Sequence, residues 1–125
     1  MIKGLGIDII EVERIKRIIK KWQGNFLNKI FTQKEINYCE KSKNYDQHFA
    51  ARFAAKEAVV KMLGTGFQNI SWKEIEIINN KKGKPQVNLY KKAKKHADNS
   101  GINIIHISLS HQKEYAIAEV IGEGE

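Results

Sequence analysis

Residues 52–66 have the sequence RFAAKEAVVKMLGTG, which is rich in strong helix formers and ends in a glycine stop. Arg52, Lys56 and Lys61 surround the single carboxylate of Glu57. Glu57 and Lys61 are four positions apart and therefore neighbours on one helix face. Such a group suits a metal ion with a polyphosphate, and it equally suits an ordinary solvated helix. Both interpretations stand until the rest of the chain is considered.

Shorter elements are expected on both sides of this helix. Apolar residues that repeat with a period of two predict strands, and those that repeat with a period near 3.6 predict helices. Asp46 is expected to cap the central helix, and the turn chemistry of residues 79–85 predicts a hairpin. The expected elements are a strand at 2–10, helices at 12–22, 26–30 and 32–41, the central helix, strands at 72–79 and 86–89, a helix at 90–99, and strands at 103–110 and 115–121.

This order predicts one domain over residues 1–125 with an α+β fold. Its sequence of elements is strand, several helices, two strands, helix and two strands, with the helices packed on a mainly antiparallel sheet. A chain of 125 residues is long enough to bury a core of its own. A doubly wound fold is disfavoured because strands and helices do not alternate.

The net charge of +8, from 22 basic and 14 acidic residues, favours a negatively charged partner. Nucleic acid, an acidic protein and a phosphorylated small molecule all meet that description. Exposed aromatic residues do not alternate with the basic runs, which weighs against nucleic acid. The alternative without a charged partner is a lysine-rich surface that only keeps the protein in solution.

The lone cysteine, Cys39, excludes an internal disulfide and fits a reducing cytoplasm. No apolar run reaches the roughly 18 residues of a membrane helix. The first residues lead directly into a strand pattern without a small-residue cleavage site, so no signal peptide is expected. We therefore expect a cytoplasmic protein without a membrane partner.

Asp8 interrupts the apolar run of the first expected strand, where aspartate is disfavoured. Leu5, Ile7 and Ile9 share one face of that strand, and Asp8 lies on the other. Asp8 is either a strand-end residue that caps the following helix or a metal ligand. An oxygen-only pair of Asp8 and Glu57 would suit Mg²⁺, which leaves most of its shell to water and phosphate. The sequence alone does not show that the two carboxylates meet.

The segment His106-Ile107-Ser108-Leu109-Ser110-His111 has imidazole and hydroxyl groups on one strand face and apolar groups on the other. It suits a solvent-facing strand or a site for phosphate or ribose. A serine nucleophile is disfavoured because no nucleophile-elbow sequence is present. The absence of the P-loop and Rossmann glycine motifs disfavours those two nucleotide-binding classes.

Several motifs in one order resemble the holo-[acyl-carrier-protein] synthase family, the small single-repeat 4′-phosphopantetheinyl transferases. The resemblance spans nearly the whole chain. The matching residues are 6–15, 52–58, 64–66, 75–77 with 83–85, and 106–111 with the strand at 116–120.

The resemblance implies transfer of the 4′-phosphopantetheine arm of coenzyme A to a serine of apo acyl carrier protein, with release of adenosine 3′,5′-bisphosphate. Asp8 and Glu57 would bind Mg²⁺, or Mn²⁺ in its place. Glu57, directly or through a metal-bound water, would be the base toward that serine. Lys61 would bind phosphate or assist proton transfer, so that Asp8, Glu57 and Lys61 form the expected catalytic set.

The resemblance also implies a nucleotide site, a homotrimer with sites at its subunit interfaces, and a docking helix for the acidic carrier protein. Two alternatives from other classes remain: a basic nucleic-acid-binding module, and a relative that binds carrier protein or nucleotide without catalysis. The expected docking residues are Arg14, Arg17, Lys20 and Lys21. The residues expected at the nucleotide site are Arg52, Lys61, Gly64, Thr65, Gly66, Pro85, His106 and Ser108.

Overall fold

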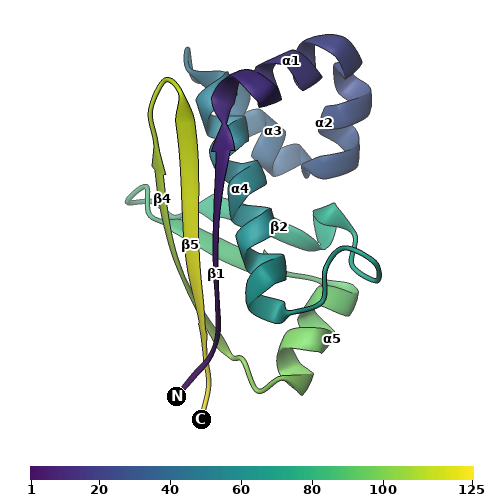
Figure 1. Ribbon diagram of the computed structural model, residues 1–125, viewed down its shortest axis with the longest axis vertical. Coiled ribbons are helices and arrows are strands. Elements are labelled where there is room, and N and C mark those ends of the chain that lie inside the picture. Colours follow the sequence, from purple (N-terminus) through teal and green to yellow (C-terminus); the bar gives the residue numbers. More distant parts are fainter.

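The computed structural model describes residues 1–125 and contains two antiparallel sheets and five α-helices (Figure 1). None of its helices has the length and apolar character that crossing a lipid bilayer requires. In chain order the elements are β1 (Ile2–Glu11), α1 (Val12–Trp22), α2 (Gly24–Ile30), α3 (Gln33–Glu40), α4 (Tyr45–Leu63), the 3₁₀ helix η1 (Trp72–Glu74), β2 (Ile75–Asn79), β3 (Pro85–Leu89), α5 (Lys91–Asn99), β4 (Ile104–His111) and β5 (Tyr115–Glu123).

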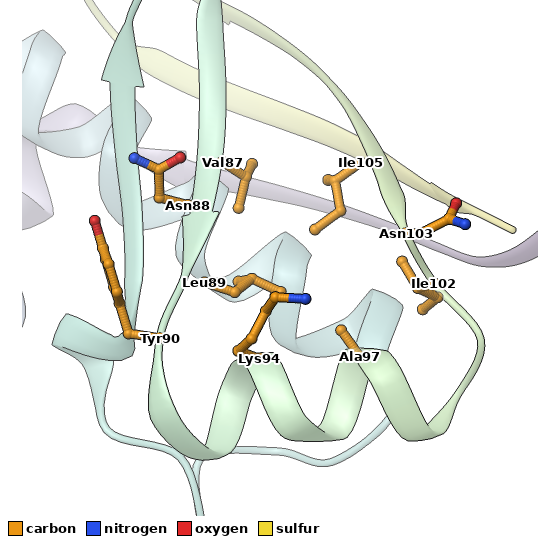
Figure 2. A pocket seen from close by; sticks show the side chains of 9 residues that line it. All are labelled: Val87, Asn88, Leu89, Tyr90, Lys94, Ala97, Ile102, Asn103 and Ile105. Atoms are coloured by element: carbon orange, nitrogen blue, oxygen red, sulfur yellow. The ribbon is translucent and has the colours of Figure 1, made fainter.

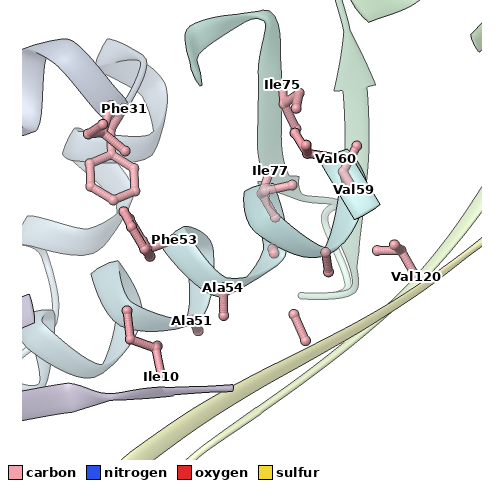
Figure 3. Packing of buried hydrophobic residues seen from close by; sticks show 14 of the residues in the cluster. Ile10, Phe31, Ala51, Phe53, Ala54, Val59, Val60, Ile75, Ile77 and Val120 are labelled. Atoms are coloured by element: carbon pink, nitrogen blue, oxygen red, sulfur yellow. The ribbon is translucent and has the colours of Figure 1, made fainter. Parts of the chain in front are cut away.

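The larger sheet has the strand order β1-β5-β4, and β2 and β3 form a separate hairpin. Helix α4 packs on the inner face of the larger sheet, while α1, α2 and α3 gather at one end and α5 at the other (Figure 1). The core lies between α4, the sheet and the hairpin, with Phe53, Val59 and Ile77 among its residues (Figure 3). The predicted α+β fold is confirmed.

Two glycines of β1 let α4 approach the sheet at backbone contact. A Cβ atom on Gly6 would lie 2.0 Å from the carbonyl oxygen of Ala58, and one on Gly4 would lie 2.4 Å from that of Met62. Real Cβ atoms do not come so close to backbone atoms. The missing side chains therefore fix how near α4 lies to β1.

Gly6→Ala is expected to destabilise the fold because α4 must move away from β1 to admit the methyl group. Overpacking of this kind costs about 1–3 kcal/mol and would lower Tm by roughly 5 °C or more. Thermal melts of the variant measure the effect. Gly24→Ala is the matched control, since its Cβ would meet nothing closer than 3.6 Å. Equal melting of both variants would contradict the packing argument.

The outer face of the larger sheet is apolar and uncovered along β1, whereas its β4 side carries His106, Ser108 and Ser110. Leu5, Ile7 and Ile9 share one face of β1 as expected, and 64%, 52% and 60% of their surfaces are exposed. On β5, Tyr115 and Ile117 face the same way and are also exposed. Because the inner face carries the core, this outer patch on β1 and the start of β5 is a second apolar surface that one chain leaves open.

Lys56 does not join the cations that the sequence suggested around Glu57. Its Nζ lies 2.8 Å from Oε1 of Glu35, and both side chains are fully buried. Burial lowers the pKa of Lys56, and the charge of Glu35 opposes that shift. The other Glu35 oxygen accepts from the backbone N–H of Ile77 at 2.8 Å. This ion pair therefore ties α3 and β2 to α4 and is structural.

Most expected boundaries agree with the structure to within two residues, and two further expectations differ from it. Helix α4 begins at Tyr45, so Asp46 lies in its first turn and Asn44 precedes it without a side-chain capping bond. Residues 72–74 form η1, and β2 begins only at Ile75. Here the carboxylate of Glu74 accepts from the N–H of Ser71 at 3.0 Å, which stabilises a helical turn in place of extended chain.

Candidate active site

The structure brings Asp8, Glu57 and Lys61 together where α4 crosses β1. The ammonium of Lys61 lies 3.1 Å from Oδ1 of Asp8 and donates to the backbone carbonyl of Ile7 at 2.9 Å. Asp8 is largely shielded from solvent, while Lys61 is exposed. The glycines on the inner face of β1 allow this meeting, because they place the helix directly over the strand that carries Asp8.

Glu57 lies one helical turn before Lys61 and is half-buried. Burial raises the pKa of Glu57, and the negative charge of Asp8 raises it further. The charges of Lys61 and Arg14 oppose the shift. Two carboxylates thus share one small region, and a cation placed between them would relieve their repulsion.

The donor set of this site suits a hard divalent cation. The structure contains no group of three or more His, Cys, Asp or Glu side chains that could hold a metal ion by protein ligands alone. Asp8 and Glu57 supply oxygen atoms only, and they leave the remaining positions to water and substrate. Mg²⁺ is bound in this way beside phosphates, whereas a structural zinc site needs four protein ligands.

Arg52 anchors a second, separate region. Only 2% of its surface is exposed, although it is a charged residue. Its guanidinium carbon lies 4.1 Å from the ring centroid of Tyr38, and its Nη2 donates to Oδ1 of Asn79. Its Nε has no acceptor among the protein atoms. The positive charge of this guanidinium lies at the wall of a cavity, where it would attract an anion.

Arg52 lines a cavity of about 420 Å³ together with Pro85 and Ser108, so three of the expected nucleotide-site residues meet. His106 lines an adjoining hollow with Pro85, and its Nε2 lies 2.9 Å from Oε1 of Glu123. The remaining lining residues of the first cavity are Tyr38, His48, Ala51, Asn79, Gly83, Lys84, Ile107, Leu109 and His111.

Sequence reasoning missed the aromatic and amide residues of that cavity. His48 and His111 pack with ring centroids 4.9 Å apart, and burial lowers the pKa of His48. Tyr38 and Asn79 contact Arg52 from α3 and β2. These residues are distant in the sequence, and except for His111 they belong to no motif. Only the position of His111 at the end of the polar β4 segment gave a signal.

The glycine loop after α4 does not line the Arg52 cavity. Gly64 has a φ of 77° and ends the helix in the left-handed conformation, as a stop signal should. Thr65 lines a different hollow of about 410 Å³ with Lys92 and Lys95. Along α4, Gly64 lies roughly 18 Å from Arg52 at 1.5 Å per residue. Within one chain, the expected nucleotide contacts at Gly64 and Thr65 therefore lie apart from the one at Arg52.

A further hollow lies between β3, α5 and β4 (Figure 2). It encloses about 340 Å³, and its walls are mostly apolar, with Val87, Leu89 and Ile105 among them. The ammonium of Lys94 is paired with Asp98 at 2.5 Å. None of the expected site residues lines this hollow.

The two candidate regions lie on opposite edges of the larger sheet. Asp8 is on β1, Ser108 is on β4, and β5 separates these two edge strands (Figure 1). The cavity that Arg52 lines includes none of Asp8, Glu57 and Lys61. On one chain, the Arg52 cavity and the Asp8–Glu57–Lys61 group therefore do not form one enclosed cleft.

Known proteins resemble this chain along nearly its whole length. The sequence model described as the 4′-phosphopantetheinyl transferase superfamily matches residues 4–120. A holo-[acyl-carrier-protein] synthase of Halothermothrix orenii is 50% identical over 123 residues, which are 98% of each chain. The corresponding protein of Caldanaerobacter subterraneus is 49% identical over 120 residues, which are 96% of this chain and 94% of that one.

Solved structures of holo-[acyl-carrier-protein] synthases have the same fold as this chain. A Bacillus anthracis holo-(acyl-carrier-protein) synthase in complex with CoA (3′,5′-ADP) has a TM-score of 0.82 and 38% identity, covering 100% of this chain and 99% of that one. A Helicobacter pylori holo-[acyl-carrier-protein] synthase in complex with coenzyme A has a TM-score of 0.84 and 32% identity, covering 95% and 99%. The fold, the motifs and these relatives agree that this chain belongs to the 4′-phosphopantetheinyl transferase superfamily.

Proposed function

We propose that this protein is a holo-[acyl-carrier-protein] synthase, which transfers 4′-phosphopantetheine from coenzyme A to a serine of apo acyl carrier protein and releases adenosine 3′,5′-bisphosphate. The observation that carries the proposal is the meeting of Asp8, Glu57 and Lys61. A protein of the same fold, the Helicobacter pylori relative, binds coenzyme A. Phosphoryl transfer needs positioning and charge stabilisation more than covalent chemistry from the protein.

Asp8 and Glu57 would hold Mg²⁺ or Mn²⁺ through their carboxylate oxygens. When bound, the cation would neutralise charge on the phosphates of coenzyme A. Glu57 is suited to accept the proton of the carrier serine, because its raised pKa brings it nearer to the strength of a useful base. Lys61 places an exposed ammonium beside the same carboxylates, where it can contact phosphate.

The chain itself supplies no nucleophile. Burial raises the pKa of the Cys39 thiol to about 12, so the reactive thiolate is absent at neutral pH. Ser108 lines the Arg52 cavity, and the two histidines of its strand are bonded elsewhere, His106 to Glu123 and His111 to Gln47. Both facts suit a reaction in which the attacking hydroxyl belongs to the carrier protein. A single reduced cysteine also suits the cytoplasm as the place of this reaction.

We further propose that the protein acts as a homotrimer whose sites lie between subunits. The uncovered apolar face around Leu5, Ile7, Ile9 and Ile117 supports this, because exposed apolar patches of this kind mark interfaces. The division of the candidate site between two sheet edges supports it as well. A neighbouring copy would place its Arg52 and Ser108 beside Asp8 and Glu57. The loop at Gly64, Thr65 and Gly66 would also contribute there, since it follows Lys61 by one turn.

The carrier protein is proposed to dock on α1, whose Arg14, Arg17, Lys20 and Lys21 are all exposed. The charge of Arg14 also lowers the pKa of Glu57, so the docking surface lies close to the catalytic region. Acyl carrier proteins are acidic, and complementary charge mainly speeds encounter and fixes register. This surface would therefore deliver the serine toward Glu57.

Arg14→Glu is expected to raise the KM for the carrier protein about tenfold and to leave the KM for coenzyme A within about twofold. The reversed charge repels the acidic partner but does not touch the nucleotide cavity. Steady-state kinetics with each substrate varied separately measure both constants. Lys73→Glu, which changes the same charge in η1, is the control. A similar rise in both KM values would remove α1 from the docking surface.

The function itself is tested with the wild-type protein, apo acyl carrier protein, coenzyme A and Mg²⁺. Intact mass spectrometry is expected to show one 4′-phosphopantetheine added to the carrier protein. An unchanged mass, with binding of coenzyme A retained, would identify a non-catalytic binder. Steep salt-dependent binding of RNA or DNA without affinity for coenzyme A would instead identify a nucleic-acid-binding module.

A further inference from the structure

Asn79 joins two walls of the Arg52 cavity. It is the last residue of β2, and its amide is hydrogen-bonded at both ends. Oδ1 accepts from Nη2 of Arg52 on α4, and Nδ2 donates to the carbonyl oxygen of Gly83 at 2.8 Å. Gly83 belongs to the turn between β2 and β3. One small side chain therefore connects the helix to the hairpin.

The orientation of the Arg52 guanidinium depends on this contact. The side chain is long and loses much rotamer freedom when it is fixed. Tyr38 covers one face of the guanidinium, but stacking alone leaves the group free to turn within its plane. The bond to Asn79 sets the remaining angle. It thereby decides where the unpartnered Nε and the other N–H groups point.

The Asn79 side chain also adds to the hydrogen bonds that Asn80 makes within the β2–β3 turn. Asn79 is paired with Pro85 in the β2–β3 register, and proline has no N–H to donate to a strand partner. The side-chain bond from Asn79 to Gly83 supports the turn at this weakened end. Gly83 has a φ of 83°, and Lys84 and Pro85 follow it along the cavity wall.

We propose that Asn79 is a positioning residue of the nucleotide site. It holds Arg52 and the Gly83–Pro85 wall at a fixed separation, so that both walls contact one bound nucleotide. The proposal rests on the proposed function, because it takes adenosine 3′,5′-bisphosphate as a ligand of this cavity. Asn79 acts through Arg52 and the turn.

Asn79→Leu tests this, because leucine has a similar shape but forms neither hydrogen bond. Binding of adenosine 3′,5′-bisphosphate is measured by calorimetry in four proteins: wild type, Asn79→Leu, Arg52→Ala and the double variant. We expect Asn79→Leu to weaken binding about tenfold in the wild-type background and less than about twofold in the Arg52→Ala background. Steady-state kinetics should show a matching rise in the KM for coenzyme A, with kcat and the carrier KM nearly unchanged.

Tyr90→Phe is the matched control. It removes the bond from the Tyr90 hydroxyl to Glu76, at the other end of the same hairpin and outside the cavity. A merely structural effect of loosening the hairpin would appear in this variant too, and we expect nucleotide binding within about twofold of wild type. Arg52→Lys replaces Arg52→Ala in the cycle if the alanine variant does not fold.

Several results would overturn the proposal. Equal losses in both Arg52 backgrounds would make Asn79 a direct ligand, and equal losses in Tyr90→Phe would make it a scaffold residue. Unchanged binding in Asn79→Leu would also remove its role. A wild-type protein that does not bind adenosine 3′,5′-bisphosphate would overturn the proposed function, and this inference with it. Wild-type binding separates these two kinds of failure.

Discussion

Glu57→Gln is expected to lower kcat/KM for phosphopantetheine transfer by about 10³-fold or more while the fold is kept. Glutamine has nearly the same shape, but it cannot accept the serine proton and is a weak ligand for a divalent cation. Asp8→Asn should behave in the same direction because Asp8 is proposed to share the cation. The measurement is the rate of mass increase of apo acyl carrier protein. Wild-type rates in either variant would remove that carboxylate from the chemistry.

The stability of the same variant provides an independent readout. The raised pKa of Glu57 means that the folded chain binds more protons than the unfolded chain between the ordinary pKa and the raised one. Stability therefore falls as the pH rises through that interval, and ionised Glu57 destabilises the fold at neutral pH. Glu57→Gln is expected to melt at a higher temperature than wild type at pH 7, and the difference should vanish in acid.

Addition of Mg²⁺ completes that test without any turnover. A ligand that binds only the folded state raises Tm. Mg²⁺ should raise the Tm of the wild-type protein and leave that of Glu57→Gln unchanged. If Mg²⁺ shifted both proteins equally, the cation would bind elsewhere. If the variant melted lower than wild type, its lost activity would reflect damage to the fold.

Two inactive variants are expected to restore each other when they share one assembly. Arg52→Ala removes the guanidinium proposed to bind the nucleotide, and Glu57→Gln removes the proposed base. Each should be nearly inactive alone, with losses of about 10²-fold or more. If one copy supplies Arg52 and its neighbour supplies Glu57, mixed trimers contain some sites with both native residues. Random mixing at equal amounts would restore about one site in four over all trimers, which is about one site in three of the mixed trimers.

Co-expression of the two variants with different affinity tags gives the mixed trimers, and sequential purification isolates them. The carrier-protein mass assay then measures the recovered rate. The control combines Glu57→Gln with Asp8→Asn, two residues of the same half-site on one chain. Because Asp8 and Glu57 lie together on one chain, each site of that mixture lacks one of the two native residues. No recovery is therefore expected. Recovery in the control, or none in the test pair, would contradict the shared site.

Much of the fold could be predicted because it depends on local chemistry. The Thr32–Glu35 capping box starts α3 as expected, since both of its reciprocal bonds are formed between near neighbours. The polar and apolar faces of β4 follow directly from its alternating sequence. Asp8 was singled out because a carboxylate is unusual in an apolar strand, but its meeting with Glu57 could be expected only from the family resemblance.

The missed features depend on residues that are distant in the sequence. Lys56 and Glu57 are adjacent in the helix and have similar local surroundings, yet one is buried against Glu35 and the other faces Asp8. Only the packing of α3 on α4 distinguishes them. Tyr38 and Asn79 could not be assigned for the same reason, since their contacts with Arg52 bring together three separate elements. The division of the site between two sheet edges also depends on the strand order.

The backbone contact between β1 and α4 has a consequence for how the enzyme can change. Gly6 and Gly4 carry no functional group, yet their lack of side chains determines the distance between Asp8 and Glu57. A methyl group at residue 6 would separate these carboxylates before any catalytic residue was altered. Selection for activity should therefore keep glycine at residues 4 and 6 as strictly as it keeps the two carboxylates that these glycines bring together.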